Sequence, residues 1–182
     1  MLGFVRDIRG FTLVELLIVM AVIAVLLSIS VAGYRNARVL GAETSAIAAL
    51  EAINQAQFAY MQTCGLQNFA PTLVELGTPV PGSGTAFLSP DLTYAEQVRK
   101  NGYFVQMAGS EVVTDVKACT GNKPASGYQV TADPTNPGST GIRYFGSNVD
   151  RVIFEGMETF TGKMPEKGAP SNGRELKLPT AR

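Results

Sequence analysis

The sequence predicts an α+β fold in which one long N-terminal helix packs on a small antiparallel β-sheet. Residues 11–32 form an almost unbroken apolar run, close to the roughly 20 residues that a helix needs to cross a bilayer. Residues 34–61 contain no proline and many alanines, which favours continuation of the helix. After residue 102, short aromatic and β-branched segments alternate with glycine and proline turns, as is typical of strands.

The second half of the helix, residues 34–63, is expected to cover one face of the sheet, because a small isolated sheet is only marginally stable. Its larger apolar side chains fall on one side of a helix, and they are Leu40, Ile47, Leu50, Phe58 and Met61. The remainder of the helix surface is expected to be polar through Glu43, Glu51, Gln55 and Gln57. Gly65 can supply a left-handed cap, so the helix is predicted to end near Cys64.

Prolines and glycines punctuate residues 65–101, which predicts an irregular connection with one short helical turn at Thr72–Leu76. Three or four strands of an antiparallel meander are then expected within residues 102–154. The expected strands are 103–108, 126–132, 142–146 and 151–154, with 112–116 as a short strand or part of a turn. The polar tail 155–182 is expected to lie over the head or to lack fixed structure.

Composition disfavours an ordinary hydrolase or metalloenzyme. The chain contains no histidine, which removes the commonest general base and the commonest metal ligand. Serines, lysines and acids are present without an orienting motif, so we expect no catalysis. The formal net charge is zero, which gives no electrostatic reason to expect a nucleic-acid partner.

The two cysteines, Cys64 and Cys119, allow two interpretations. In an oxidising compartment they would form one disulfide, which stabilises a loop of this length by about 4 kcal/mol in the chain-entropy model. In a reduced protein they would be two buried thiols. Their spacing excludes a CxxC redox or zinc motif.

Glu15 interrupts the apolar run near its start. A lone acid at membrane depth costs on the order of 3 kcal/mol on insertion scales. It would therefore pair with a group on another chain, or it would lie at headgroup level, where one acid is tolerable. These physical arguments alone leave both interpretations open.

The order of residues around Glu15 is more specific. A short leader with Arg6, Asp7 and Arg9 is followed by Gly10-Phe11-Thr12-Leu13-Val14-Glu15-Leu16. This segment closely resembles the prepilin cleavage motif of type IV pilins and type II secretion pseudopilins. In that family a membrane peptidase cuts after the glycine and methylates the new N-terminal residue.

The resemblance implies cleavage between Gly10 and Phe11, N-methylation of Phe11 and an assembly role for Glu15. An ordinary secretory signal, cut after its apolar region near Ala32 and Gly33, is the alternative. The acid and the Gly-Phe junction argue against it, because an ordinary signal core needs neither.

The resemblance also implies a pilin-like organisation of the chain. We expect a leader at 1–10, a transmembrane and filament-core half-helix at 11–33, an amphipathic half-helix at 34–63 and a globular head at 64–182. Within the head we expect a connecting loop at 65–101, the sheet at about 102–154 and the tail at 155–182. Cys64 and Cys119 would tie the end of the helix to the sheet.

The expected function is that of a structural subunit of a type IV pilus, in particular a major pilin. The alternatives are a major pseudopilin of a type II secretion system and a single-pass anchored protein that does not polymerise. The expected partners are further copies of the chain, the prepilin peptidase, the inner-membrane assembly machinery and the membrane itself. The subunit would sit in the inner membrane before assembly and in an extracellular pilus or a periplasmic pseudopilus afterwards.

No cofactor is expected, although a pseudopilin would raise the question of calcium, which some major pseudopilins hold near the C-terminus. The acids of the head are scattered without the spacing of an EF-hand loop, and they include Asp133, Asp150, Glu155 and Glu158. We therefore interpret them as surface acids. Adhesion, motility, DNA uptake, a conductive role, glycosylation and helical symmetry stay open.

Overall fold

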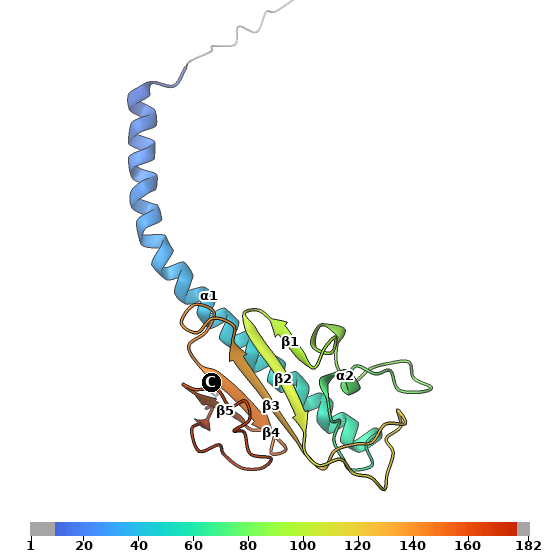
Figure 1. Cartoon of the computed structure of the whole chain (residues 1–182). Helices are drawn as coiled ribbons and strands as arrows, with labels where there is room; N and C mark the ends of the chain where they lie inside the picture. The colour runs from blue at the N-terminus through green and yellow to red at the C-terminus, as the bar shows by residue number, and fades with distance from the viewer. Residues whose placement is uncertain (1–9, 178–182) are drawn as a thin grey trace, which may run out of the picture. The chain divides into compact units, whose positions relative to one another are not determined.

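The computed structural model describes residues 10–177, except for the side chains of residues 29–32. The chain divides into two compact units, residues 1–37 and 38–182. Helix α1 (Leu13–Thr63) contributes to both units (Figure 1). Its second half packs on the sheet. Its first half is the only described helix or strand within residues 10–37.

The head contains a six-stranded antiparallel sheet in which the spatial order of the strands follows the sequence. The strands are β1 (Gln97–Lys100), β2 (Tyr103–Gly109), β3 (Tyr128–Pro134), β4 (Tyr144–Asn148), β5 (Ile153–Gly156) and β6 (Arg174–Glu175). The meander is therefore confirmed, but it has six strands where three or four were expected. It extends from Gln97 to Glu175, beyond the expected limits of about 102 and 154.

Two short helical turns lie between α1 and β1. Helix α2 (Leu73–Leu76) begins after Thr72, whose side chain accepts a hydrogen bond from the N–H of Glu75, so the predicted turn is confirmed. The 3-10 turn η1 (Pro90–Leu92) follows. Asn101 and Gly102, both with positive φ, then form the two-residue loop that joins β1 to β2. This is the usual chemistry of a tight hairpin.

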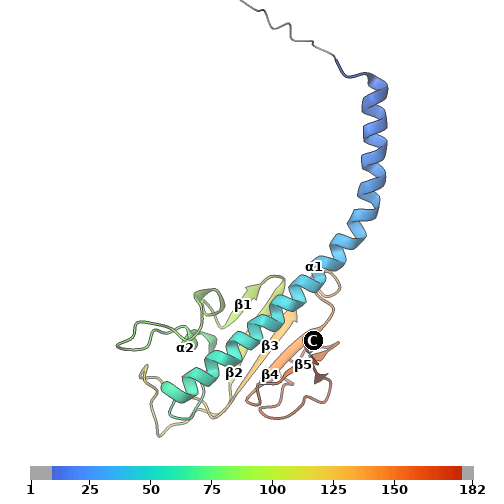
Figure 2. The ribbon, with the colours of Figure 1, turned by 180° about the vertical axis from the view of Figure 1, so that it is seen from behind.

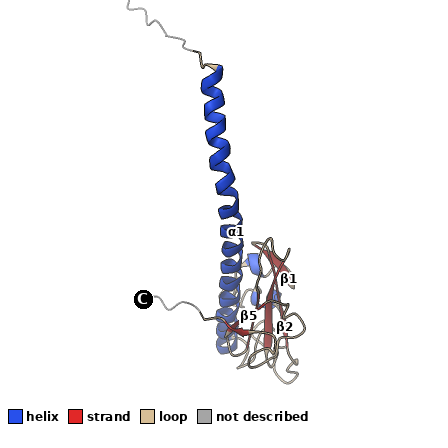
Figure 3. Cartoon of the chain, turned by 90° about the vertical axis from the view of Figure 1, so that its left-hand side faces the viewer, coloured by secondary structure: helices blue, strands red, loops and turns tan. Residues whose placement is uncertain are grey.

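The second half of α1 lies across one face of the sheet (Figures 2 and 3). Small side chains supply much of its buried apolar surface, which consists of Ala46, Ala49, Leu50, Ile53, Ala56 and Tyr60. The sheet side of this core includes Val98, Tyr103, Val105, Tyr128, Val130, Ala132 and Phe145. The alanines allow the helix backbone to approach the large side chains of the strands closely.

The predicted apolar stripe is partly wrong. Leu50 is buried, but Leu40 is 59% exposed and Phe58 lies under the guanidinium of Arg151, whose carbon is 4.3 Å from the ring centre. Glu43 and Gln57, expected on the polar side, are both buried. Each has specific partners in the head, which the pattern of apolar residues could not indicate.

The opposite face of the sheet is partly covered by the chain that follows β5. Phe160 and Met164 from this segment pack with Phe154 of β5 in a small second cluster. Strand β6 then pairs with β5, with Phe154 opposite Glu175 and Glu155 opposite Arg174. The polar composition of this segment gave no indication that Phe160 is fully buried and Met164 nearly so.

Candidate functional site

Helix α1 begins at Leu13, within the segment that resembles the prepilin motif. The hydroxyl oxygen of Thr12 accepts a hydrogen bond from the N–H of Glu15 at 3.2 Å, and the same hydroxyl lies 3.4 Å from a carboxylate oxygen of Glu15. The carbonyl of Thr12 accepts from the N–H of Leu16 at 3.2 Å. Thr12 therefore caps the helix, and Glu15 occupies its first turn, where the helix dipole favours an anion.

Among the described residues, no other part of the chain covers the apolar surface of this half-helix. All described side chains from Phe11 to Ser28 are exposed, including Phe11 at 77% and Leu13 at 80%. Within residues 10–177, α1 is the one helix long and apolar enough to cross a membrane, with a mean hydropathy of 2.8 over its most apolar window. Such a surface is stable only in lipid or against other apolar surfaces.

Glu15 is the only charged residue between Phe11 and Tyr34. Among the described residues no basic group lies within ion-pair distance of it. Its carboxylate is therefore available to a partner from another molecule.

Gly10 and Phe11 are exposed and precede the helix, so their peptide bond is accessible. The leader residues 1–9 lie outside the described residues. Cleavage after Gly10, methylation of Phe11 and the assembly role of Glu15 stay predictions.

A second cluster fixes α1 to the sheet at the start of the head. Glu43 is 4% exposed and accepts hydrogen bonds from the backbone N–H groups of Ile142 and Arg143 at 3.0 and 3.2 Å. The Arg143 guanidinium donates to Glu43 at 2.7 Å and to Glu155 at 2.6 Å, and Arg174 donates to Glu155 at 2.8 Å. Four charged groups from α1, the β3–β4 connection, β5 and β6 thus form one chain of ion pairs.

This network controls the ionisation of its acids. Burial alone would raise the pKa of Glu43, but hydrogen bonds from Ile142 and Arg143 and the charge of Arg143 lower it below its ordinary value of 4.5. Burial also raises the pKa of Glu155. The hydrogen bonds and charges of Arg143 and Arg174 have the larger opposite effect, so the pKa of Glu155 is lowered as well. Both acids are therefore held in their charged form at neutral pH.

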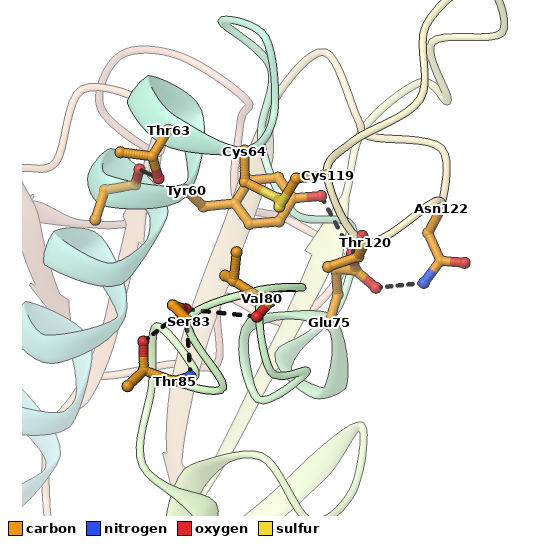
Figure 4. The surroundings of a disulfide bond; sticks show 11 residues. Tyr60, Thr63, Cys64, Glu75, Val80, Ser83, Thr85, Cys119, Thr120 and Asn122 are labelled. Carbon is orange, nitrogen blue, oxygen red and sulfur yellow. Dashed lines mark hydrogen bonds between the residues drawn. A yellow bond between two sulfur atoms is a disulfide. The ribbon is translucent and has the colours of Figure 1, made fainter.

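The far end of the helix is fixed covalently. A disulfide joins Cys64, directly after α1, to Cys119 in the β2–β3 connection, with Cα atoms 4.7 Å apart (Figure 4). The disulfide expected from the sequence is thus present. The N–H of Cys119 also donates to the carbonyl of Cys64 at 3.0 Å.

A buried carboxylate, that of Glu75 in α2, lies beside this disulfide. Tyr60 donates to it at 3.2 Å and Asn122 at 2.7 Å, and the hydroxyl of Thr120 donates as well (Figure 4). Burial and the nearby charge of Glu75 raise the pKa of Tyr60 above its ordinary value, so the phenol remains a donor. Glu75 therefore ties the β2–β3 connection to both helices.

The acids considered for calcium have protein partners. Asp133 accepts hydrogen bonds from Thr159 at 2.5 Å and Thr161 at 3.1 Å, and Asp150 accepts from the N–H of Gly168 at 2.7 Å. Glu155 pairs with the two arginines described above, and Glu158 lies 3.8 Å from Lys163. Residues 10–177 contain no group of three or more His, Cys, Asp or Glu arranged to hold a metal ion.

Residues 5–31 match the family model for the prokaryotic N-terminal methylation motif. The match covers the last part of the leader, the Gly10–Phe11 junction, Glu15 and most of the apolar run. No curated protein and no solved structure matches the chain. The fold, a long helix on an antiparallel sheet, is a pilin-like architecture. The chain therefore carries the signature of the type IV pilins and pseudopilins.

Sequence reasoning missed two features of these sites. The Thr12–Glu15 cap has a signal in the sequence, because a threonine followed three residues later by a glutamate before an apolar run is the spacing of a capping box. The Glu43 network has none, because its partners are about 100 residues away in sequence.

Proposed function

We propose that this chain is the major structural subunit of a type IV pilus, processed after Gly10 and polymerised through its N-terminal helix. The observation that carries the proposal is the exposed apolar surface of residues 11–28 with a single acid, Glu15, at its start. The methylation motif at residues 5–31 supports the same class of filament-forming proteins.

Before assembly, the half-helix spans the membrane, since its length matches the hydrocarbon core. In the filament, the same apolar surfaces of many copies pack against one another. Glu15 then leaves water, and its partner is the methylated cationic amine of Phe11 on a neighbouring copy. Removing one member of a buried ion pair costs several kcal/mol, so the pair selects the register of assembly.

The processing step is tested by an intact mass and an N-terminal sequence of the protein purified from its native membrane or fibres. We expect the mature chain to begin at Phe11 and to carry one additional methyl group. A native chain that still begins at Met1, or that begins after Ala32 or Gly33, would exclude this processing.

Assembly is tested by replacing Glu15 with leucine or alanine. We expect the yield of sheared fibres to fall about ten-fold or more, because the amine of the neighbouring Phe11 would be buried without its partner. Glu51→Gln is the control, since it removes an acid from the same helix within the head. Fibre yields for E15L equal to those of the wild type would refute the role of Glu15.

The pseudopilin alternative predicts a different location of the filament. Long fibres on the cell surface, seen by negative-stain microscopy after shearing, identify a pilus. A short filament confined to the periplasm, together with a head whose melting temperature falls when calcium is chelated, identifies a pseudopilin. A chain that is membrane-anchored but monomeric under all conditions of expression identifies a simple single-pass anchor.

A further inference from the structure

A positively charged cleft opens in the head close to the point where α1 enters it. Its volume is about 360 Å³, and it lies between α1, the β1–β2 turn and the β3–β4 connection. The residues that matter for its chemistry are Arg38, Gly41, Arg99, Asn101, Gly102 and Thr140. The side chain of Asn101 donates to the hydroxyl of Ser45 at 2.7 Å, which holds the turn against the helix.

The two arginines of the cleft have no compensating acid. Among the described residues, neither the Arg38 nor the Arg99 guanidinium makes an ion pair or a hydrogen bond. The nearby acids are already occupied, since Asp91 pairs with Lys100 at 2.6 Å and Glu43 pairs with Arg143. None of the described residues that line the cleft is acidic. Its charge therefore suits an anionic ligand.

One residue of the cleft, Arg38, is close along the chain to the end of the apolar run. Arg38 follows Ala32, the last residue of the apolar run, by six helical residues, a path of about 9 Å at 1.5 Å per residue. The polar layer on each side of the hydrocarbon core is about 5–7 Å thick, and an arginine side chain extends several ångströms toward it.

We propose that this cleft binds the phosphate headgroup of an anionic phospholipid, of the phosphatidylglycerol type, while the precursor is in the membrane. The proposal rests on the membrane stage of the proposed function. Arg38 and Arg99 supply the charge. The side-chain amide of Asn101, which uses one of its two hydrogens on Ser45, supplies a neutral donor. The bound lipid holds the head at the bilayer surface until the subunit leaves the membrane for the filament.

The test compares lipid retention by the full-length chain in detergent micelles, measured by native mass spectrometry with added POPG or POPC. We expect the wild type to retain POPG in preference to POPC. Each of R38Q and R99Q should weaken POPG retention about five-fold, because a basic residue near an anionic membrane contributes on that scale. The double variant should lose the preference.

The matched control is the double variant K117Q/K123Q, which removes the same charge from the β2–β3 connection near the disulfide. This connection is attached to the helix at Cys64, about 39 Å along α1 from Arg38. POPG retention by this variant should equal that of the wild type. A similar loss in both double variants would show a general charge effect and would overturn the proposal.

Two further results would overturn it. If inorganic phosphate displaces POPG at equal concentration, the cleft is a site for any phosphate. If R38Q/R99Q abolishes fibres in cells but leaves POPG retention unchanged, the arginines contact an acid on a neighbouring copy.

Insertion of the chain into POPC nanodiscs is a separate measurement, which tests the membrane stage of the proposed function. Failure to insert would count against the membrane stage of the proposed function, whereas insertion without POPG preference counts only against the lipid site.

Discussion

At the scale of single residues, Glu43 connects two distant parts of the chain. It accepts backbone N–H groups at Ile142 and Arg143 and the guanidinium of Arg143, so one carboxylate fixes α1 to the start of β4. A buried carboxylate is costly unless it is paired and hydrogen-bonded. Here both conditions are met, and the side chain specifies where along the helix the sheet docks.

We predict that Glu43→Gln lowers the free energy of unfolding by about 2 kcal/mol at pH 7. The expected loss is smaller than for a fully buried pair, because Arg143 is 34% exposed and keeps Glu155 as a partner. Urea titration of the purified head in both forms measures the difference. Glu111→Gln, an exposed acid, is the control and should change stability by less than about 0.5 kcal/mol.

The same pair predicts a dependence on acid pH. The pKa of Glu43 is lower in the folded protein than its ordinary value of 4.5, so its charge stabilises the fold fully above that pH. The contribution is lost as the pH falls from about 4.5 through the folded pKa. The difference between wild type and E43Q should therefore be constant from pH 7 to about pH 5 and shrink below pH 4.5. A difference that grows on acidification would contradict this assignment.

At the scale of elements, the sequence predicted those segments whose local chemistry agrees with their final environment. The strands rich in aromatic and β-branched residues and the Thr72-capped turn were found where expected. Strand β1 was missed because Gln97–Lys100 is polar on its exposed side. Asn101-Gly102 before Tyr103 is the signal that could have revealed it, since this dipeptide is the strongest short hairpin signal.

The buried face of α1 was misassigned for a different reason. The pattern of large apolar residues includes Leu40 and Phe58, but the sheet selects Ala46, Ala49 and Ala56, which permit close approach. Buried polar groups complete the same face. Gln57 exchanges two hydrogen bonds with the backbone of Ala70, both at 2.9 Å, and Asn54 accepts from Tyr128 and donates to Ser147. Such partners depend on tertiary structure and are not visible in helical periodicity.

The disulfide acts on two elements at once, the end of α1 and the β2–β3 connection. Its two cysteines are 55 residues apart, so in the chain-entropy model the cross-link stabilises the fold by about 4 kcal/mol. We predict that C64S/C119S loses about this amount in urea unfolding. Dithiothreitol should destabilise the wild type to the same extent and leave the double variant unchanged. Equal stability of oxidised and reduced wild type would exclude a structural role for the bond.

At the scale of the whole molecule, the N-terminal motif was the most predictable feature, because it is a linear segment. The leader, Gly10, Phe11 and Glu15 are consecutive or nearly so, and their order can be recognised without a fold. The Glu43 network and the arginine cleft instead combine residues from several elements. Arg38 and Arg99 are 61 positions apart in the sequence, and only the docking of the helix on the hairpin brings them to one cleft.

The division into two units predicts that the head folds without the apolar half-helix. We expect residues 38–182 alone to be monomeric without detergent, to form the Cys64–Cys119 bond and to unfold cooperatively, because the core lies entirely within this unit. The full chain should require detergent or lipid, because its exposed apolar surface lies in residues 11–28. Size-exclusion chromatography and thermal unfolding followed by near-ultraviolet circular dichroism test both statements.

The Ile53→Ala variant of the same fragment is the matched control. Ile53 is fully buried between helix and sheet, and its truncation should cost about 3 kcal/mol and lower the melting temperature markedly. A cooperative transition that shifts in I53A shows that the fragment has the packed core of the head. A fragment that aggregates, lacks a near-ultraviolet signal or is insensitive to I53A would show that residues 11–37 are needed for folding. The half-helix would then be part of the structural core, and the separation of a folded head from a filament-forming helix would be wrong.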